Sequence, residues 1–332
     1  MTTNARSPDE KRKSIAYFQS HESDSRARLI GSSESYMFGE DVGNHVMPLG
    51  GQSKSRPEFR VALLPDSADS EQIIRYALPK DGHLLRSVTE AVSDFMEHAA
   101  YVLAFHGIIH YEIATGAWLL RYQMSERRVE DVLAPERLFR PLRIPGKVLR
   151  IGSLYLQIVP KADRVKHGRA FVSIPQNQVW ILRIPHMLGG PGGHQRLLKS
   201  FAKSSEPLPK FVRDEMEKLG DFGEFSFQEF HRQRMLTLAS ETANWGWDAR
   251  ELWRNDTLEY FRVYRQLRFA RSMAILRDYL ISSINSLLGR IAFPARITVH
   301  GLPTREDIDG VISALAKKEV SINEALVAVD IW

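Results

Sequence analysis

The chain contains no cysteine, which excludes disulfide bonds, thiolate nucleophiles and cysteine-ligated zinc. It also lacks any apolar run of about 18 residues, so we expect neither a membrane-spanning helix nor a membrane partner. The segment from Met1 to Lys13 is polar, mixed in charge and without the apolar core of a secretory signal, so secretion is not expected. A reducing compartment is compatible with these absences.

Familiar patterns of catalytic residues are missing as well. No Ser-His-Asp order includes a nucleophile elbow, and no carboxylate cluster lies within a motif. His106, His110 and Glu112 could suggest zinc, but Gly107 breaks the helix on which such a histidine pair would have to lie. We therefore predict no metal, no cofactor and no enzyme. An unrecognised hydrolase is an alternative, with His106, His110 and His186 as the first residues to substitute.

The composition is that of an ordinary globular protein with a mildly basic balance. Of 332 residues, 43% are apolar and 26% are charged, and the formal net charge is +5 with a pI near 9.3. This length accommodates one large domain or two smaller ones. The net charge alone does not indicate a nucleic-acid partner, because proteins that bind nucleic acids concentrate their positive charge.

The amino-terminal part is poor in large apolar residues. Residues 1–57 contain Ser, Asp, Glu, Arg, Lys and Gly in no regular period. Such a segment cannot bury enough surface to offset the entropy lost on ordering, so we predict a flexible N-terminal arm. An arm that orders against a neighbouring subunit is the functional alternative.

Helix and strand patterns alternate over residues 58–188, which predicts an α+β region. An apolar stripe from Leu84 to Phe105 predicts a helix, with capping-box spacing between Ser87 and Glu90 and a stop at Gly107. Short strand candidates surround it: Phe59–Pro65, a hairpin over Ile108–Met124 that turns at Thr115-Gly116, and strand-like runs within Lys147–Pro160 and Ala170–Pro185.

Residues 189–295 are predicted to be mainly helical. The glycines from Gly189 to Gly193 predict a hinge, or else an anion-binding turn before a helix. One helix is predicted over Phe227–Ala243. A much longer one over Thr257–Ile291 would span roughly 50 Å.

Residues 296–332 are predicted to form a C-terminal helical segment. Thr304 and Ser321 have the spacing of N-caps for two short helices, Arg305–Lys317 and Ile322–Val329. The predicted fold class is therefore α+β, with a helix-plus-strands region followed by a mainly helical half that contains one long helix.

The long predicted helix carries arginines and has no acidic residue between Tyr260 and Arg277. Three-residue steps drift around a helix, so the arginines form a broad positive flank and not a straight line. Phosphate contacts from this flank would be indifferent to base sequence. A solvated helix face, or ion pairs with Glu251, Glu259 or Asp278, is equally compatible with the pattern. The set is Arg262, Arg265, Arg268, Arg271 and Arg277.

Three tryptophans, Trp245, Trp247 and Trp253, lie within nine residues around Gly246. Packing between two helices is one interpretation of this cluster. A contact surface is the other, because tryptophan anchors many interfaces.

Several segments follow one another in an order known from one family. The helix over 84–105 runs into GIIHYEIATG, and strands follow in RPLRIPGKVLRIG (Arg140–Gly152). IPQNQVWILRIPHMLGGPGG (Ile174–Gly193) then leads into a glycine-rich turn and helix. LISSINSLLGRI (Leu280–Ile291) and LAKKEVSINEALVAV (Leu315–Val329) come last. In this order of segments, over roughly Phe59 to Val329, the chain resembles the portal proteins of tailed bacteriophages.

The resemblance implies a ring, commonly of twelve subunits, at one capsid vertex, with an axial tunnel through which DNA is packaged and ejected. It implies residues 58–188 as a wing-like region and 189–295 as a stem or tunnel-like region. The partners would be further copies of the chain, double-stranded DNA bound without sequence specificity, capsid protein, terminase and a head–tail adaptor. The location would be the virion, after assembly in the host cytoplasm. The DNA-proximal residues would be Arg262, Arg265, Arg268, Arg271, Trp245 and Trp247.

A nucleic-acid-binding module and another virion assembly protein are the remaining alternatives. The two capped helices within Arg305–Val329 loosely resemble a helix-turn-helix. The second of them carries Glu324 and no basic residue, which is unsuitable for reading a major groove.

Overall fold

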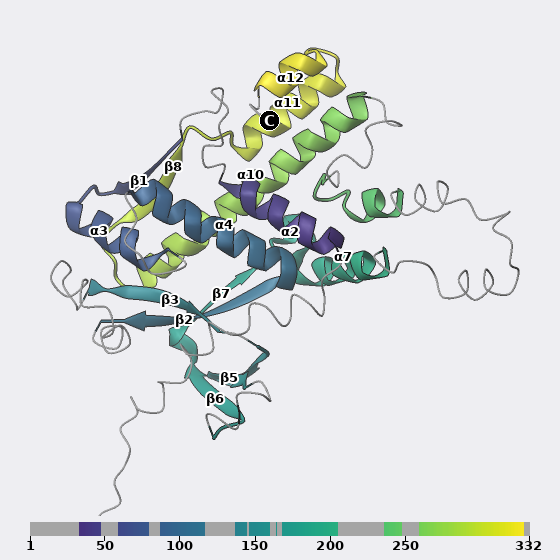
Figure 1. The fold of residues 1–332 in the computed structure, drawn as a ribbon. Coiled ribbons are helices and arrows are strands. Elements are labelled where there is room, and N and C mark those ends of the chain that lie inside the picture. Colours follow the sequence, from purple (N-terminus) through teal and green to yellow (C-terminus); the bar gives the residue numbers. More distant parts are fainter. Residues whose placement is uncertain are drawn as a thin grey trace, which may run out of the picture.

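The protein has an α+β fold with a helix-rich carboxy-terminal half, as the sequence predicts (Figure 1). The computed structural model describes residues 33–47, 59–79, 87–116, 137–144, 146–159, 164, 168–204, 236–247 and 259–328. The helices are α2 (Ser33–Val46), α3 (Ala68–Ala77), α4 (Val88–His106), α7 (Gly190–Ser204), α10 (Glu259–Arg290), α11 (Arg305–Ala316) and α12 (Ile322–Ala328), with short 3-10 turns at η3 (Gln176–Gln178) and η4 (His186–Leu188).

Helix α4 begins after the predicted cap Ser87, four residues later than the predicted start at Leu84, and ends at the predicted stop Gly107. The Ser87 hydroxyl accepts a hydrogen bond from the backbone N–H of Glu90 at 3.1 Å. Gly107 has a φ of 71°, and its N–H donates to the Leu103 carbonyl at 2.7 Å. A left-handed glycine in this place is a common helix end. The predicted cap and the predicted stop are both confirmed.

The strands form three small antiparallel sheets, in the orders β1-β8, β3-β2-β7 and β4-β5-β6. The described neighbours of β2 are β3 and β7, which both come later in the chain. Thr115 at the end of β2 lies opposite Phe139 of β3. The predicted second strand of the hairpin, residues 117–124, lies outside the described residues. The strands are β1 (Arg60–Leu64), β2 (Ile108–Thr115), β3 (Phe139–Arg143), β4 (Val148–Ile151), β5 (Leu154–Ile158), β6 (Phe171–Pro175), β7 (Val179–Arg183) and β8 (Arg296–His300).

Helix α4 lies in the middle of the main core (Figure 1). Phe95 of α4 stacks on Trp180 of β7, with ring centroids 5.7 Å apart. On another face of α4, Tyr101 meets α2 at Gly43, where an added Cβ would lie only 3.2 Å from the Cβ of Tyr101. The absence of a side chain at Gly43 therefore lets the two helices cross closely.

Helix α2 corrects the prediction of a flexible arm over residues 1–57. Phe38, Val42, Val46 and Met47 are all fully buried in the main core. The first three are spaced by four residues, which places them on one helix face. This stripe is short and interrupted by acidic and small residues, so its pattern in the sequence is weak. The rest of the predicted arm lies outside the described residues.

The long helix predicted over Thr257–Ile291 is confirmed as α10. Its carboxy-terminal half contributes Leu280, Ile284 and Leu287 to the main core. Its amino-terminal half packs instead against α11 and α12, in a separate core that contains Val263. One helix therefore joins the two cores (Figure 1).

The two carboxy-terminal helices begin at their predicted caps. Thr304 and Asp307 form a capping box in which each side chain accepts a hydrogen bond from the other residue's backbone N–H. Ser321 and Glu324 make the same reciprocal pair at α12. Just before these helices, β8 pairs with β1, so the predicted C-terminal segment and the predicted wing-like region share one sheet.

We predict that Phe38→Ala lowers the free energy of unfolding by about 3–5 kcal/mol, because it opens a cavity among fully buried aromatic rings. Asn44→Ala changes an exposed side chain of the same helix and should alter stability by less than about 0.5 kcal/mol. Urea unfolding followed by circular dichroism measures both values. Equal and small effects would show that α2 does not belong to the cooperative core.

Candidate nucleic-acid interface

The predicted arginines all lie on α10 but face different surroundings. A step of three residues falls about 60° short of a full helical turn, so Arg262, Arg265, Arg268 and Arg271 are spread around half of the helix. Some of them must therefore point into the protein, whatever the sequence pattern suggests. The structure divides them into buried, paired and outward-facing side chains.

Arg265 is buried, with 7% of its surface exposed. Its guanidinium donates to the Ala239 carbonyl at 2.9 Å, to the Thr242 hydroxyl at 2.8 Å and to the Trp247 carbonyl. These oxygens belong to the carboxy-terminal end of a helix, described over 236–241, and to the turn after it, where a cation offsets the negative end of the helix dipole. Arg265 thus holds a turn in place and is not available to DNA.

Trp245 and Trp247 are each 2% exposed and belong to the main core. Their rings lie edge-on to Phe38 of α2, at centroid distances of 5.2 and 5.3 Å. The indole N–H of Trp247 donates to the Asp41 carboxylate at 2.7 Å. The interpretation of these tryptophans as packing residues is confirmed. Their prediction as DNA-proximal residues, and that of Arg265, is wrong because all three side chains are buried inside one subunit.

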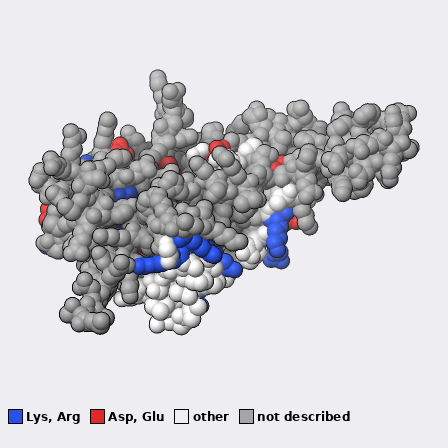
Figure 2. Space-filling model, turned by 60° about the horizontal axis from the view of Figure 1, so that its bottom comes forward, with Lys and Arg blue, Asp and Glu red and all other residues white. Residues whose placement is uncertain are grey.

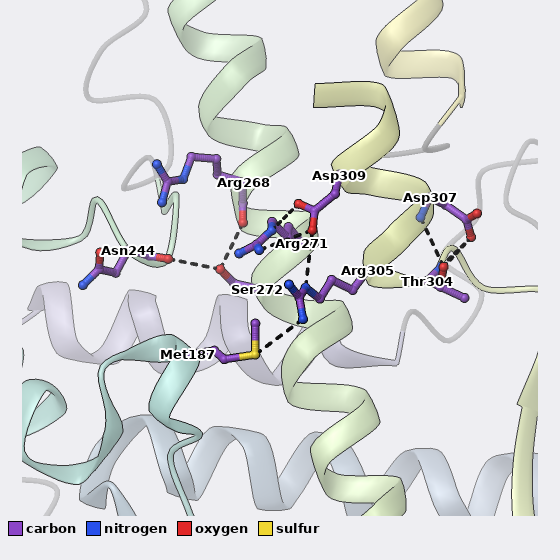
Figure 3. A network of polar contacts seen from close by, with 9 residues as sticks. All are labelled: Met187, Asn244, Arg268, Arg271, Ser272, Thr304, Arg305, Asp307 and Asp309. Atoms are coloured by element: carbon purple, nitrogen blue, oxygen red, sulfur yellow. Dashed lines mark hydrogen bonds and ion pairs between the residues drawn. The ribbon is translucent and has the colours of Figure 1, made fainter. Parts of the chain in front are cut away.

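Arg271 forms an ion pair with Asp309 of α11, which also accepts a hydrogen bond from Arg305 at 3.3 Å (Figure 3). The bond from Arg271 lowers the pKa of Asp309, and Arg305 adds to this effect. The ion-pair partner of Arg271 is therefore Asp309 of α11. It is not one of the predicted acids Glu251, Glu259 and Asp278. Arg277 is also engaged, because its buried guanidinium donates to the Pro303 carbonyl.

The outward side of the amino-terminal half of α10 is a stripe of two tyrosines and one arginine. Tyr260 and Tyr264 are stacked, with centroids 6.4 Å apart and ring planes within 9° of parallel. The Arg268 guanidinium lies 5.9 Å from the centre of the Tyr264 ring. Spacings of four residues place all three on one face of the helix. We call Tyr260, Tyr264 and Arg268 the outward stripe; the partly exposed Arg262 is another arginine of this half.

This arrangement can bind a nucleic-acid backbone without reading its bases. Arginine contacts phosphate through a planar fork of N–H donors, and exposed aromatic rings offer flat faces on which sugars or bases can stack. Tyr260 and the neighbouring Phe261 are each 43% exposed. Figure 3 shows Arg268 directed away from the Arg271–Asp309 pair, while Ser272 bonds to the backbone of Arg268 and Asn244.

The other motifs singled out in the sequence do not form a reactive site in the part of the chain that is described. His106 ends α4, and its Nε2 accepts a hydrogen bond from the Arg143 guanidinium at 3.1 Å, whereas His110 lies on β2. Within the described ranges, no group of three or more His, Asp or Glu side chains could hold a metal ion. The glycines from Gly189 to Gly193 span the left-handed Gly189 and the first turn of α7.

None of the helices in the described ranges is both long enough and apolar enough to cross a bilayer.

A concentration of positive charge in the β-rich part belongs to none of the motifs singled out in the sequence. Among the described residues of 137–204, eleven are Lys or Arg and none is Asp or Glu. Figure 2 shows the end of the molecule that carries β5 and β6, where Lys and Arg side chains flank an uncharged lobe. A count of charge in successive windows of the sequence would have found this segment. The net charge of the whole chain hides it, because other elements such as α2 and α4 are acidic.

No protein-family model, no curated protein and no solved structure matches the chain.

His194 of α7 lies beside the tryptophan cluster and gives the fold a pH dependence. It is buried, and its Nε2–H donates to the Ala104 carbonyl at 2.7 Å. Burial lowers the pKa of His194 to about 4, against about 6.5 in an unfolded chain. A histidine kept neutral in this way stabilises the fold above about pH 6.5, and its contribution is lost as the pH falls toward 4, because the unfolded chain takes up the proton first.

We therefore predict that the free energy of unfolding falls between pH 7 and pH 5, with about 2 kcal/mol of the fall due to His194. His194→Gln keeps a donor for the Ala104 carbonyl and cannot titrate, so its stability should fall by that much less over the same interval. Urea titrations of both proteins at the two pH values measure the difference. Equal falls in the two proteins would contradict the assignment.

Proposed function

We propose that this protein is a portal-type subunit that assembles into a ring at a capsid vertex and passes double-stranded DNA through its axial tunnel. The order of segments along the chain supports this proposal, as does the uninterrupted helix α10. The proposal brings its partners with it: further copies of the chain, capsid protein, terminase and a head–tail adaptor. The site of action would be the virion, after assembly in the host cytoplasm.

The observation that carries the proposal is the two-sided character of the amino-terminal half of α10. One side, with Val263 and Leu267, is fully buried against α11 and α12. The other side carries the outward stripe, in a segment whose only acidic residue is Glu259 at the helix start. A tunnel has to hold DNA in position without gripping it, and contacts to the backbone alone suit that task better than contacts to base edges.

The helix-turn-helix alternative has less support. Both α11 and α12 are anchored on α10 through buried residues, among them Ile308, Leu315 and Ala325. The described part of α12 has no basic residue, and Glu324 is exposed near its start. A recognition helix needs a free face with donors for base edges and phosphates. These two helices therefore serve better as a cover for α10.

We predict that Arg262→Ala together with Arg268→Ala weakens DNA binding to the same extent on unrelated duplexes. Each lost phosphate contact should reduce the slope of log affinity against log salt by about 1, so the double variant should lose about 2. Fluorescence anisotropy with two duplexes of different sequence, measured from low to moderate salt, gives both quantities.

The matched control removes two exposed cations elsewhere, with Arg296→Ala and Lys317→Ala. This control has the same net charge as the test variant, so it isolates position from total charge. An identical loss of DNA affinity in both variants would contradict the assignment of DNA binding to α10. Binding that prefers one sequence and survives moderate salt would favour a specific reader over a portal.

We also predict that the purified protein forms closed rings with an open centre, most often of twelve subunits. Negative-stain electron microscopy across a range of protein concentrations tests this directly. Particles that remain monodisperse monomers at the highest concentration would overturn the portal proposal.

A further inference from the structure

The small sheet β4-β5-β6 has apolar residues on both of its faces. One face, with Tyr155, Val172 and Ile174, covers a local core. Antiparallel sheets commonly present polar residues on the other face, because that face meets water. Here the outward positions are apolar instead, and four of them are 38–57% exposed: Leu149, Ile151, Leu154 and Phe171.

The strand register brings these four residues onto one surface. Ile151 of β4 lies opposite Leu154 of β5. Phe171 of β6 lies opposite Ile158 of β5. Alternation along each strand sends all of them to the side away from Tyr155. We call this surface of Leu149, Ile151, Leu154 and Phe171 the sheet face. Exposed apolar surfaces with a polar rim usually mark an interaction site.

The rim of the sheet face is basic. Lys147 precedes β4 and Arg169 precedes β6, whereas Arg150 lies opposite Tyr155 and so belongs to the other face of the sheet. No acidic residue accompanies them among the described residues of 137–204. A surface with this charge would repel a second sheet face, so direct pairing of two such sheets is disfavoured. It would attract a partner surface that is acidic and also offers apolar contact.

Such a surface exists on the same chain, where α2 crosses α4. The two helices contain no Lys or Arg, and four of their six acidic residues reach the surface at least in part, because Glu34 and Asp41 are buried. Tyr36, which is 46% exposed, packs against Tyr101 with centroids 6.4 Å apart. Burial, and to a smaller extent the nearby Asp94, raises the pKa of Glu97 to about 7, so this carboxyl is only partly ionised at neutral pH. We call Tyr36, Glu40, Asp94, Glu97 and Tyr101 the acidic face.

We propose that the sheet face of one copy docks on the acidic face of a second copy. The two faces are different surfaces of the subunit, so the contact is head-to-tail, and repeating it gives a closed ring when the rotation between copies divides a full turn. This inference rests on the proposed function, because it names the contact by which the ring would form. It assigns the apolar contribution to the sheet and the charge complementarity to the rim.

The size of the sheet face fits a contact that is repeated around a ring. Four side chains that are about half exposed offer on the order of 400 Å² of apolar surface, which is within the range of a functional patch. A stable isolated pair buries roughly 800 Å² on each partner. One such contact is therefore weak alone, and ring closure strengthens it because each subunit is then held at two places.

The test uses two variants that each block one face. Ile151→Glu with Phe171→Glu blocks the sheet face, and Glu40→Lys with Glu97→Lys blocks the acidic face. Each variant alone should stay monomeric in sedimentation velocity at concentrations where the wild-type chain forms oligomers, with an affinity at least about tenfold weaker. An equimolar mixture retains one intact face of each kind, so it should form a one-to-one dimer, at concentrations higher than those at which the wild-type chain assembles because each pair has a single contact. Circular dichroism and thermal unfolding confirm that both variants are folded.

The matched control is Glu40→Gln with Glu97→Gln, which removes charge without reversing it and should weaken assembly less than the lysine variant. A mixture that remains monomeric would overturn the proposal, as would a sheet-face variant that assembles like the wild-type chain. Dimers of the acidic-face variant alone would show that sheet faces pair with each other. Binding to vesicles of anionic phospholipid that is lost in the sheet-face variant, with assembly unchanged, would assign this face to a lipid surface instead.

The docking proposal and the proposed function can fail separately. DNA binding by the outward stripe is measured on the monomeric variants, whose α10 is unchanged. Rings that form normally with a blocked sheet face would overturn the docking contact and leave the portal proposal standing. A one-to-one dimer from variants with no affinity for DNA would support the docking contact and count against the portal proposal.

Discussion

The burial of the Arg265 guanidinium constrains most of the helical half. A charge removed from water is tolerated only when it is surrounded by hydrogen-bond partners, and here the partners are carbonyl and hydroxyl oxygens of residues 236–247. That segment must therefore lie directly on α10. Gly246 allows the approach, because a Cβ there would lie 2.6 Å from the carbonyl carbon of Arg268 on α10. Trp247 then reaches Asp41, which fixes α2 in turn.

This constraint also decides which charges remain for function. Arg265 is used to hold the turn, and Arg271 is used to hold α11 through Asp309. Both are structural ties, and each removes a cation from the flank that the sequence suggests. The positive charge left on the outward side is sparse and partly stacked on tyrosine. A surface of this kind favours weak binding to DNA that is independent of base sequence. The proposed passage of DNA through a tunnel requires binding of this kind.

Features that depend on neighbouring residues were predictable from the sequence, and features that depend on distant ones were not. The caps at Ser87 and Thr304 and the length of α10 follow from local hydrogen bonds and apolar spacing. Helix α2 escaped prediction because its stripe is short and its burial depends on tryptophans about 200 residues later in the chain. The Asp309 partner of Arg271 escaped for the same reason, since α11 folds back onto α10 only in three dimensions.

Charge is the exception, because its distribution is visible in the sequence without knowledge of the fold. Residues 1–116 include sixteen Asp or Glu and twelve Lys or Arg, whereas residues 137–204 include thirteen Lys or Arg and a single acid, Asp163. Two opposite charges held on one rigid subunit make any contact between identical copies directional: like regions repel, and unlike regions attract. A head-to-tail contact satisfies this rule for every copy only if the chain of contacts closes on itself or grows without end. For the proposed head-to-tail contact, the charge pattern thus disfavours pairing of like regions and leaves a closed ring or an open filament.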